Sequence, residues 1–192
     1  MKERYIFSQN DLYERFLYLS KFVEFGETEL KLISESVAIL APFLSELLDN
    51  IYDRLLSFED SAQYFLNEDE SVNDDYIAVR KEHLTGWLFS IVEVSNLKDL
   101  VSYLEGVALV HSSHAGEDDR PVPPRYLVVL SNFIQNEIWS ILFRALPNDL
   151  EKIQKFGLAW NKFLNLQLEL FLKVNVPSWP YWDEKGHKNE IG

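Results

Sequence analysis

The feature that most limits the fold of this chain is a helical repeat of apolar residues along almost its whole length. Apolar side chains recur three and four residues apart, as on one face of an α-helix. No stretch shows the alternation, turn and second alternation that are typical of a β-hairpin. The 7 glycines and 7 prolines stand mostly between the periodic stretches. The pattern therefore predicts an all-α fold.

The periodic stretches predict seven or eight helices in a single domain over residues 1–192. We expect a first helix over 10–25 that ends at Gly26, and a second stretch from Thr28 to Leu55 that Pro42 splits or bends. The acidic segment 58–75 is expected to be a loop with one short helical turn around Tyr64 and Phe65.

Four more helices follow from the same period. They are expected over 75–94 with a cap at Asp74 or Asp75, over 96–114, over 123–146, and from an Asn148 cap to about 174. Residues 176–192 are expected to form an irregular tail. Because the helices differ in length, they fit globin-like packing better than a regular four-helix bundle.

Composition excludes several classes of function. The chain has 18 Lys and Arg against 31 Asp and Glu, so its formal net charge of -13 disfavours nucleic-acid and anionic membrane partners. Without cysteine it has no disulfide, zinc-thiolate site or thiol nucleophile. It has no signal-peptide pattern, and no apolar run approaches the ~18–20 residues of a membrane span. We therefore expect a soluble, cytoplasmic protein.

Two of the 4 histidines end an apolar helix in "SYLEGVALVHSSHAGEDD", residues 102–119. His111 points in nearly the same direction as Leu104 and Val107, toward the interior, while His114 is turned toward the acidic loop. A buried imidazole needs a partner for each ring nitrogen, and a metal is one such partner. Two histidines that simply favour the negative end of a helix dipole explain the pattern as well.

Tyr52 is a second polar group on an apolar face. It shares the helix face of Leu48 and Leu55, so its hydroxyl is carried toward the core and needs a partner there. A backbone carbonyl would satisfy the hydroxyl, and so would a bound ligand.

Five segments resemble those of protoglobins and of single-domain globins from the globin-coupled sensor lineage. They occur in the family's order and span roughly residues 28–175. The segments are "LLDNIYDRL…AQYF", "YIAVRKEHLTGWL", "YLEGVALVH", "VPPRYLVVL" and "AWNKFLNLQLEL". The resemblance implies a globin core over 27–175 with an extra N-terminal helix within residues 1–26.

The resemblance also implies a non-covalent haem b and assigns roles to residues of this chain. His111 corresponds to the proximal ligand of the iron, and Tyr52 to the distal tyrosine that donates a hydrogen bond to bound oxygen. The further pocket-lining positions that we infer are Phe65, Leu84, Trp87, Val107, Leu130 and Ile134. Ile51 and Leu84 stand where the family often has aromatic residues, which predicts a differently shaped pocket.

Other ligand arrangements remain open at this point. His114 could replace His111, since some relatives have adjacent histidines at this place. His83 could give six-coordinate iron, but it lies one residue before Leu84 and is turned about 100° from the ligand-facing line.

The implied function is reversible binding of O₂, CO or NO for gas sensing or scavenging. One alternative is a haem enzyme acting on NO, nitrite or peroxide with an external reductase, and another is a haem-free signalling module. A separate signalling partner is also expected. The aromatic residues of the last two long helices predict either a large core or a homodimer interface, as is frequent in the family; they are Trp139, Phe143, Phe156, Trp160, Phe163 and Phe171.

Overall fold

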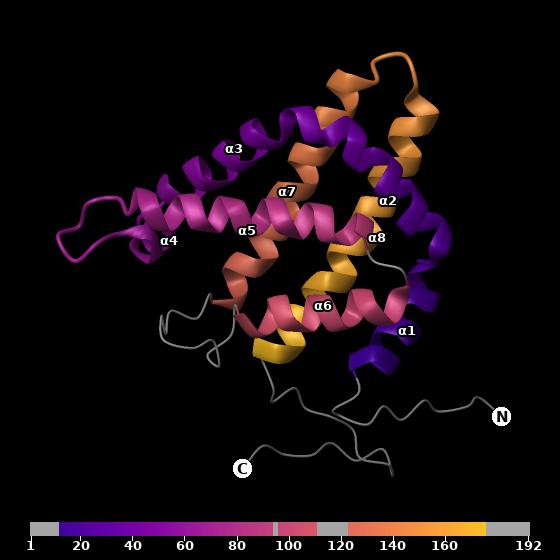
Figure 1. Cartoon of the computed structure of the whole chain (residues 1–192), viewed down its shortest axis with the longest axis horizontal. Helices are drawn as coiled ribbons and strands as arrows, with labels where there is room; N and C mark the ends of the chain where they lie inside the picture. The colour runs from indigo at the N-terminus through magenta and orange to yellow at the C-terminus, as the bar shows by residue number, and fades with distance from the viewer. Residues whose placement is uncertain (1–11, 94–95, 111–122, 176–192) are drawn as a thin grey trace, which may run out of the picture.

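The computed structural model describes residues 12–93, 96–110 and 123–175 (Figure 1). This part of the chain is helical, with one isolated β-bridge between Leu66 and Val72, so the predicted all-α class is confirmed. The α-helices are α1 (Leu12–Val23), α2 (Glu27–Leu40), α3 (Leu44–Leu56), α4 (Glu59–Ala62), α5 (Asp74–Glu93), α6 (Leu97–Val110), α7 (Pro124–Ala145) and α8 (Leu150–Asn175). Two short 3-10 helices, η1 (Ala41–Phe43) and η2 (Gln63–Phe65), continue α2 and α4.

The helix breaks follow the predicted punctuation, but two caps lie one residue away from the expected ones. Pro42 lies in η1, which separates α2 from α3. The N-cap of α5 is Asn73, whose Oδ1 accepts a hydrogen bond from the backbone N–H of Tyr76 at 2.9 Å, and not Asp74 or Asp75. The N-cap of α8 is Asp149 and not Asn148, since Asp149 Oδ1 accepts from Lys152 N at 3.0 Å. Neighbouring Asn and Asp side chains cap equally well, so sequence alone does not choose between them.

Gly26 begins the second helix and does not end the first. Its backbone is extended, with φ -158°, and its N–H donates to Glu29 Oε2 at 2.9 Å, as in a capping box. The left-handed position after α1 is taken instead by Glu24, with φ 54°. Lys162 of α8 donates to the Glu24 carbonyl at 2.7 Å, so an ion-paired lysine stabilises this turn.

Helix α8 forms the centre of the packing. It lies against α7 over the longest stretch, and also against α2, α6 and α1. Trp160 is fully buried, and its Nε1 donates to Ser36 Oγ at 2.8 Å, which in turn donates to the Ile33 carbonyl at 2.7 Å. The only polar atom of this large side chain is therefore satisfied inside the core.

The contact between α7 and α8 depends on a glycine. A Cβ atom at Gly157 would lie 2.2 Å from Cζ2 of Trp139, so the indole of α7 occupies the space that a side chain would need. Trp139 also stacks on Phe143 with ring centroids 5.9 Å apart. The absence of a side chain at 157 thus sets how closely the two longest helices approach.

Helix α1 packs onto α6 and α8 and is part of the described interior. Phe16 is buried and meets Phe25 edge-on, at 6.3 Å between ring centroids. Arg15 forms an ion pair with Glu169 of α8. Apolar burial and this half-buried pair together attach the helix to the rest of the domain.

Helices α5 and α6 are supported by different neighbours. Helix α5 rests on α2 and α3, whereas α6 rests on α8 and α1, and α5 and α6 lie apart in Figure 1. Within the described residues they do not pack extensively against one another. None of the helices described here has the length and apolar character needed to cross a bilayer.

We expect Gly157→Ala to destabilise the fold. The new methyl group meets a rigid aromatic ring, and such overpacking costs about 1–3 kcal/mol of unfolding free energy. Gly86→Ala is the matched control, because nothing lies within 4 Å of its Cβ position in α5. That helix-interior replacement should stabilise the protein by about 0.5–1 kcal/mol. Urea unfolding followed by circular dichroism measures both values, and equal stability of Gly157→Ala and wild type would contradict the close-contact account.

Candidate functional site

Tyr52 is a buried tyrosine on α3 whose hydroxyl is not used by the fold. The side chain is 6% exposed, and its ring meets Phe65 edge-on at 5.7 Å between centroids. Lys81 Nζ lies 5.7 Å from the centroid of the same ring. The hydrogen bonds within the described residues do not include the Tyr52 hydroxyl, so the backbone-carbonyl alternative receives no support there. Within the described residues the fully enclosed side-chain atoms without a hydrogen bond are Ser20 Oγ and Glu169 Oε2, so the Tyr52 hydroxyl is not one of them and its O–H is open to water or to a ligand.

Burial also fixes the protonation state of this hydroxyl. Removal from water raises the pKa of Tyr52 well above its ordinary value; the charge of Arg80 opposes that rise, and Tyr76 adds to it. The group is therefore a neutral O–H donor throughout the physiological pH range. Such a donor suits an acceptor that carries partial negative charge.

One face of α5 continues the site from Tyr52. Tyr76, Arg80 and Leu84 follow one another at four-residue spacing and so share this face. The Tyr76 ring lies 6.1 Å from Phe65, which joins this face to Tyr52. Leu84 is half-buried and packs on the main core. Sequence reasoning missed Tyr76 and Arg80, although their spacing from Leu84 would have identified them.

Trp87 lies on the α8 side of α5. Its Nε1 donates to Gln167 Oε1 at 3.0 Å, and its ring centroid is 6.0 Å from Trp160 and 6.2 Å from Phe163. These contacts fix the indole in the core between α5 and α8. The structure therefore does not bring Trp87 together with the aromatic group around Tyr52.

His83 is an exposed residue of α5. Its Nδ1 lies 3.4 Å from Nη1 of Arg80, one turn earlier. Because a guanidinium only donates, this contact requires the unprotonated nitrogen of the imidazole. An exposed ring held in this way by Arg80 does not support six-coordinate iron through His83.

The other predicted positions divide between two apolar clusters. Ile134 belongs to the main cluster, and Leu130 and Phe65 pack against it. Val107 packs instead against a smaller, separate cluster of Ala108, Leu127 and Phe171, to which Leu168 is also attached. Both clusters include residues of α6, α7 and α8, and the smaller one uses the end of α6, the start of α7 and the end of α8.

His111 and His114 lie outside the described residues, directly after the last described turn of α6. Val107 stands four residues before His111, on the helix that carries the smaller cluster. No group of three or more His, Cys, Asp or Glu side chains that could hold a metal ion occurs in the part of the chain that the structure describes.

These residues fit a haem group. Phe65, Leu84, Val107 and Leu130 are apolar and half-buried, as residues that line a site for an apolar ligand would be. The Tyr52 hydroxyl would supply a hydrogen-bond donor, and the chemistry of imidazole suits His111 or His114 to ligate the iron. With 0 cysteines the chain offers no covalent attachment, so a haem here would be non-covalent.

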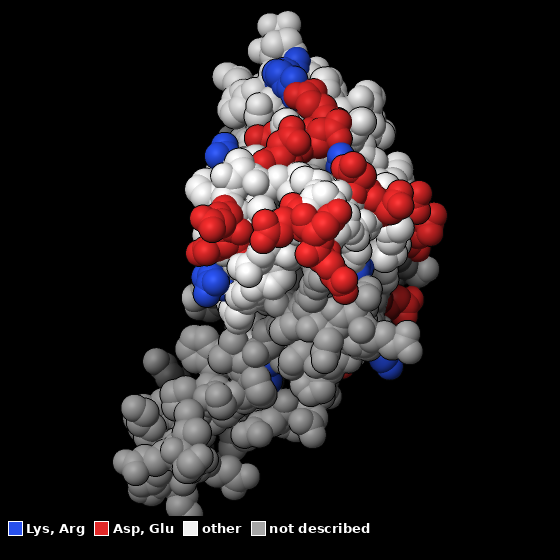
Figure 2. Space-filling model, turned by 90° about the vertical axis from the view of Figure 1, so that its left-hand side faces the viewer, with Lys and Arg blue, Asp and Glu red and all other residues white. Residues whose placement is uncertain are grey.

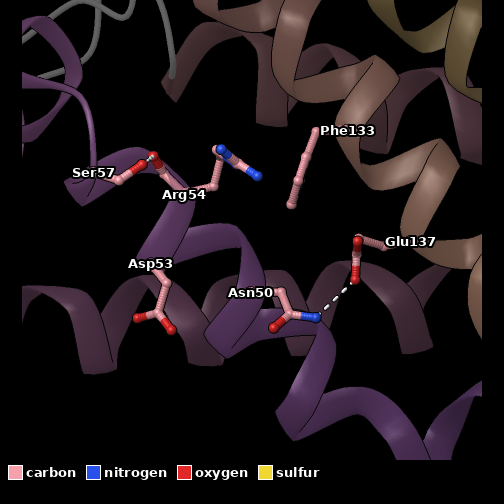
Figure 3. A pocket seen from close by; sticks show the side chains of 6 residues that line it. All are labelled: Asn50, Asp53, Arg54, Ser57, Phe133 and Glu137. Carbon is pink, nitrogen blue, oxygen red and sulfur yellow. Dashed lines mark hydrogen bonds between the residues drawn. The ribbon is translucent and has the colours of Figure 1, made fainter.

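A hollow lies between α3 and α7, away from the residues named so far, and sequence reasoning did not identify it (Figure 3). Its volume is about 450 Å³, and it is lined by Asn50, Asp53, Arg54, Ser57, Phe133 and Glu137. Asn50 Nδ2 donates to Glu137 Oε2 at 2.8 Å, and the Arg54 guanidinium lies 5.5 Å from the Phe133 ring. A polar stripe at positions 50, 53, 54 and 57 of α3 was the available sequence signal. Because polar side chains line most of the hollow and interact with one another, it is a polar groove on the surface.

Acidic side chains cover the face that lies at the left of Figure 1, where α4 and the start of α5 are found (Figure 2). Between Arg54 and Arg80 the sequence has 7 Asp and Glu and no Lys or Arg, and all 7 are exposed. The local field on this face therefore attracts cations and repels anions.

Comparison with known proteins agrees with the geometry. The family model described as Protoglobin matches residues 12–178. The globin domain of the Geobacter sulfurreducens globin-coupled sensor superposes with a TM-score of 0.64, covers 82% of this chain and 95% of its own, and is 16% identical in sequence. None of the curated proteins matches. At that identity the structural match establishes a globin fold, and the family match over most of the length establishes more: the chain belongs to the protoglobin family.

Proposed function

We propose that this chain binds a non-covalent haem b through His111 and reversibly takes up O₂, CO or NO, for gas sensing or scavenging. The observation that carries the proposal is the buried side chain of Tyr52, whose hydroxyl makes no hydrogen bond within the described residues and is not fully enclosed, so that a ligand can reach it. The pattern after α6 and membership of the protoglobin family support it. Haem supplies an open coordination position for a diatomic ligand when one protein nitrogen holds its iron.

In this proposal each residue has a defined task. The Tyr52 hydroxyl donates a hydrogen bond to a ligand that carries partial negative charge. It stays neutral because burial raises its pKa. Phe65 holds the Tyr52 ring edge-on and limits its rotation. Leu84 and Leu130 exclude water from the ligand and so strengthen the Tyr52 hydrogen bond.

We also propose that the chain forms a homodimer through α7 and α8. Phe156, Trp160, Phe163 and Phe171 are buried within the chain, so a large core accounts for these four aromatic residues. Phe143 and Leu158 are instead 50% and 46% exposed. Phe143 stacks on Trp139, which covers Gly157, and Leu158 is the next residue of α8, so exposed apolar side chains occur on both helices near this contact.

His111→Ala should abolish stable haem uptake. The protein purified with added haemin is expected to lose the Soret band, because the variant lacks the imidazole that the proposal assigns to the iron. His114→Ala is the matched control and should keep a normal spectrum. A normal band in His111→Ala together with a lost band in His114→Ala would reassign the ligand, and a wild-type protein that takes up no haemin would support a haem-free module.

Tyr52→Phe should speed O₂ release about 5- to 10-fold, because one neutral hydrogen bond contributes about 1–1.5 kcal/mol. CO carries less negative charge, so its dissociation should change less than about twofold. Stopped-flow displacement measures both rates. Tyr64→Phe, in which the altered ring contacts Tyr126 at 6.1 Å, is a control that should leave both rates unchanged. Equal acceleration for the two gases would contradict the donor role.

Phe143→Glu and Leu158→Glu should each convert the dimer to a monomer. The new charge would be desolvated in an apolar interface, which is strongly unfavourable. Val79→Glu, at an apolar position of α5 that is similarly exposed, should leave the dimer intact. Light scattering after size exclusion gives the mass of each variant. A wild-type protein that elutes as a monomer at high concentration would refute the interface.

A further inference from the structure

Five amide side chains of α7 and α8 are joined by hydrogen bonds along the contact between these helices. Gln135 Nε2 of α7 donates to Asn161 Oδ1 of α8 at 2.7 Å, and Asn165 Nδ2 donates to the same oxygen at 2.8 Å. On α7, Asn136 Nδ2 donates to Asn132 Oδ1 at 3.2 Å. Gln135 and Asn161 are half-buried, and the three other asparagines are exposed. We call these five residues the amide cluster.

The hydrogen bonds within the amide cluster leave both donors and acceptors unused. In the described part of the chain, Asn161 Nδ2 and Asn132 Nδ2 donate no hydrogen bond. The side-chain oxygens of Gln135, Asn136 and Asn165 accept none there. Because an amide both donates and accepts, a surface that presents unused groups of both kinds can pair with an identical surface. A two-fold related copy of the same chain presents such a surface.

The amide cluster continues from the exposed apolar residues of the homodimer interface proposed above. Asn161 follows Leu158 by three residues on α8, and Asn136 precedes Phe143 by seven on α7, so each pair shares one face of its helix. Exposed apolar side chains and amide side chains therefore occur along the same contact between the two helices.

This part of the surface has few carboxylates, although the chain as a whole is strongly acidic. Residues 153–168 of α8 include no Asp or Glu, and residues 126–143 of α7 include only Glu137. Glu137 Oε2 accepts a hydrogen bond from Asn50 of α3, so this carboxylate lies on the α3 side of α7. Contact between two copies along the amide cluster therefore does not bring a group of carboxylates together.

The basic residues of the same stretch of α8 are already paired. Lys155 Nζ lies 2.7 Å from Glu151 Oε1, and Lys162 Nζ lies 3.1 Å from Glu29 Oε1. Two copies that each carry a net charge of -13 repel one another in general. The stretch around the amide cluster, with few charges and with those paired, is where a second copy can approach at the least electrostatic cost.

We propose that the amide cluster makes this face of α7 and α8 selective for a second copy of the chain. The inference rests on the homodimer proposed above and names the residues that recognise the partner. In the dimer the unused donors of one copy meet the unused acceptors of the other. A partner with a purely apolar surface would leave these groups without hydrogen bonds once water is excluded, which is unfavourable. A polar residue within an apolar interface selects the partner in the same way in coiled coils.

Asn161→Asp tests the proposal with little change inside the chain. The new carboxylate can still accept from Gln135 Nε2 and Asn165 Nδ2, so both of these hydrogen bonds are retained. The substitution removes the unused Nδ2 donor and brings one negative charge from each copy into the interface. The dissociation constant of the dimer should rise at least about tenfold, because like charges in an interface repel strongly. Sedimentation over a series of concentrations measures this constant.

Asn148→Asp is the matched control, because it adds the same charge in the exposed turn between α7 and α8, 13 residues before Asn161. It should change the dissociation constant less than about twofold. A second measurement does not involve a mutation. The side-chain amide NMR signals of Asn161 should shift when the wild-type protein is diluted from dimer to monomer, and signals that stay unchanged would overturn the role of the amide cluster.

The outcomes separate this inference from the homodimer on which it rests. Wild-type protein that stays monomeric at high concentration removes the homodimer, and this inference with it. A wild-type dimer that Phe143→Glu dissociates but Asn161→Asp leaves intact overturns the role of the amide cluster alone. Equal weakening by Asn161→Asp and Asn148→Asp also overturns that role, since the effect would then come from net charge.

Discussion

The close approach of α7 and α8 at Gly157 is the constraint on which the rest of the structure depends. Because no side chain separates the helices there, Trp139 can lie directly on α8. That contact leaves the opposite side of α8 to be covered by α2, α6 and α1. Trp160 then finds its hydrogen-bond acceptor on α2 at Ser36, so a single helix with one glycine organises most of the interior. The site residues are carried by the helices that this framework supports.

The candidate site illustrates how a polar group that the packing does not use can indicate function. The Tyr52 ring is buried, while its hydroxyl makes no hydrogen bond within the described residues and is not fully enclosed. The surrounding rings hold that hydroxyl in place by contacts that an alanine or serine could not make. An O–H donor held in this way is available to a ligand, which agrees with the globin fold and protoglobin membership of the chain.

Most of the fold could be predicted from the sequence because each helix has a clear apolar stripe and strong breaks. The errors concern caps, where Asn73 competes with Asp74 and Asn148 with Asp149, and the conformation of Gly26, since a glycine can end one helix or precede the next. Within the site, the burial of Tyr52 followed from its spacing. The positions of Trp87 and Arg80 did not follow, because an indole can face either of two neighbouring helices and a charged residue is ordinarily assigned to solvent.

The separation of the apolar interior into two clusters has a consequence for how the domain melts. In the described part of the chain, Ala108, Leu127 and Phe171 group separately from the larger cluster, although the same three helices contribute to both. Parts of a protein joined in this way can open independently, at a lower free energy than the whole. A flat apolar molecule that touched both groups would bind them into one cooperative unit. Binding of such a ligand would then make the two clusters unfold together, so that ligand binding would raise the cooperativity of unfolding.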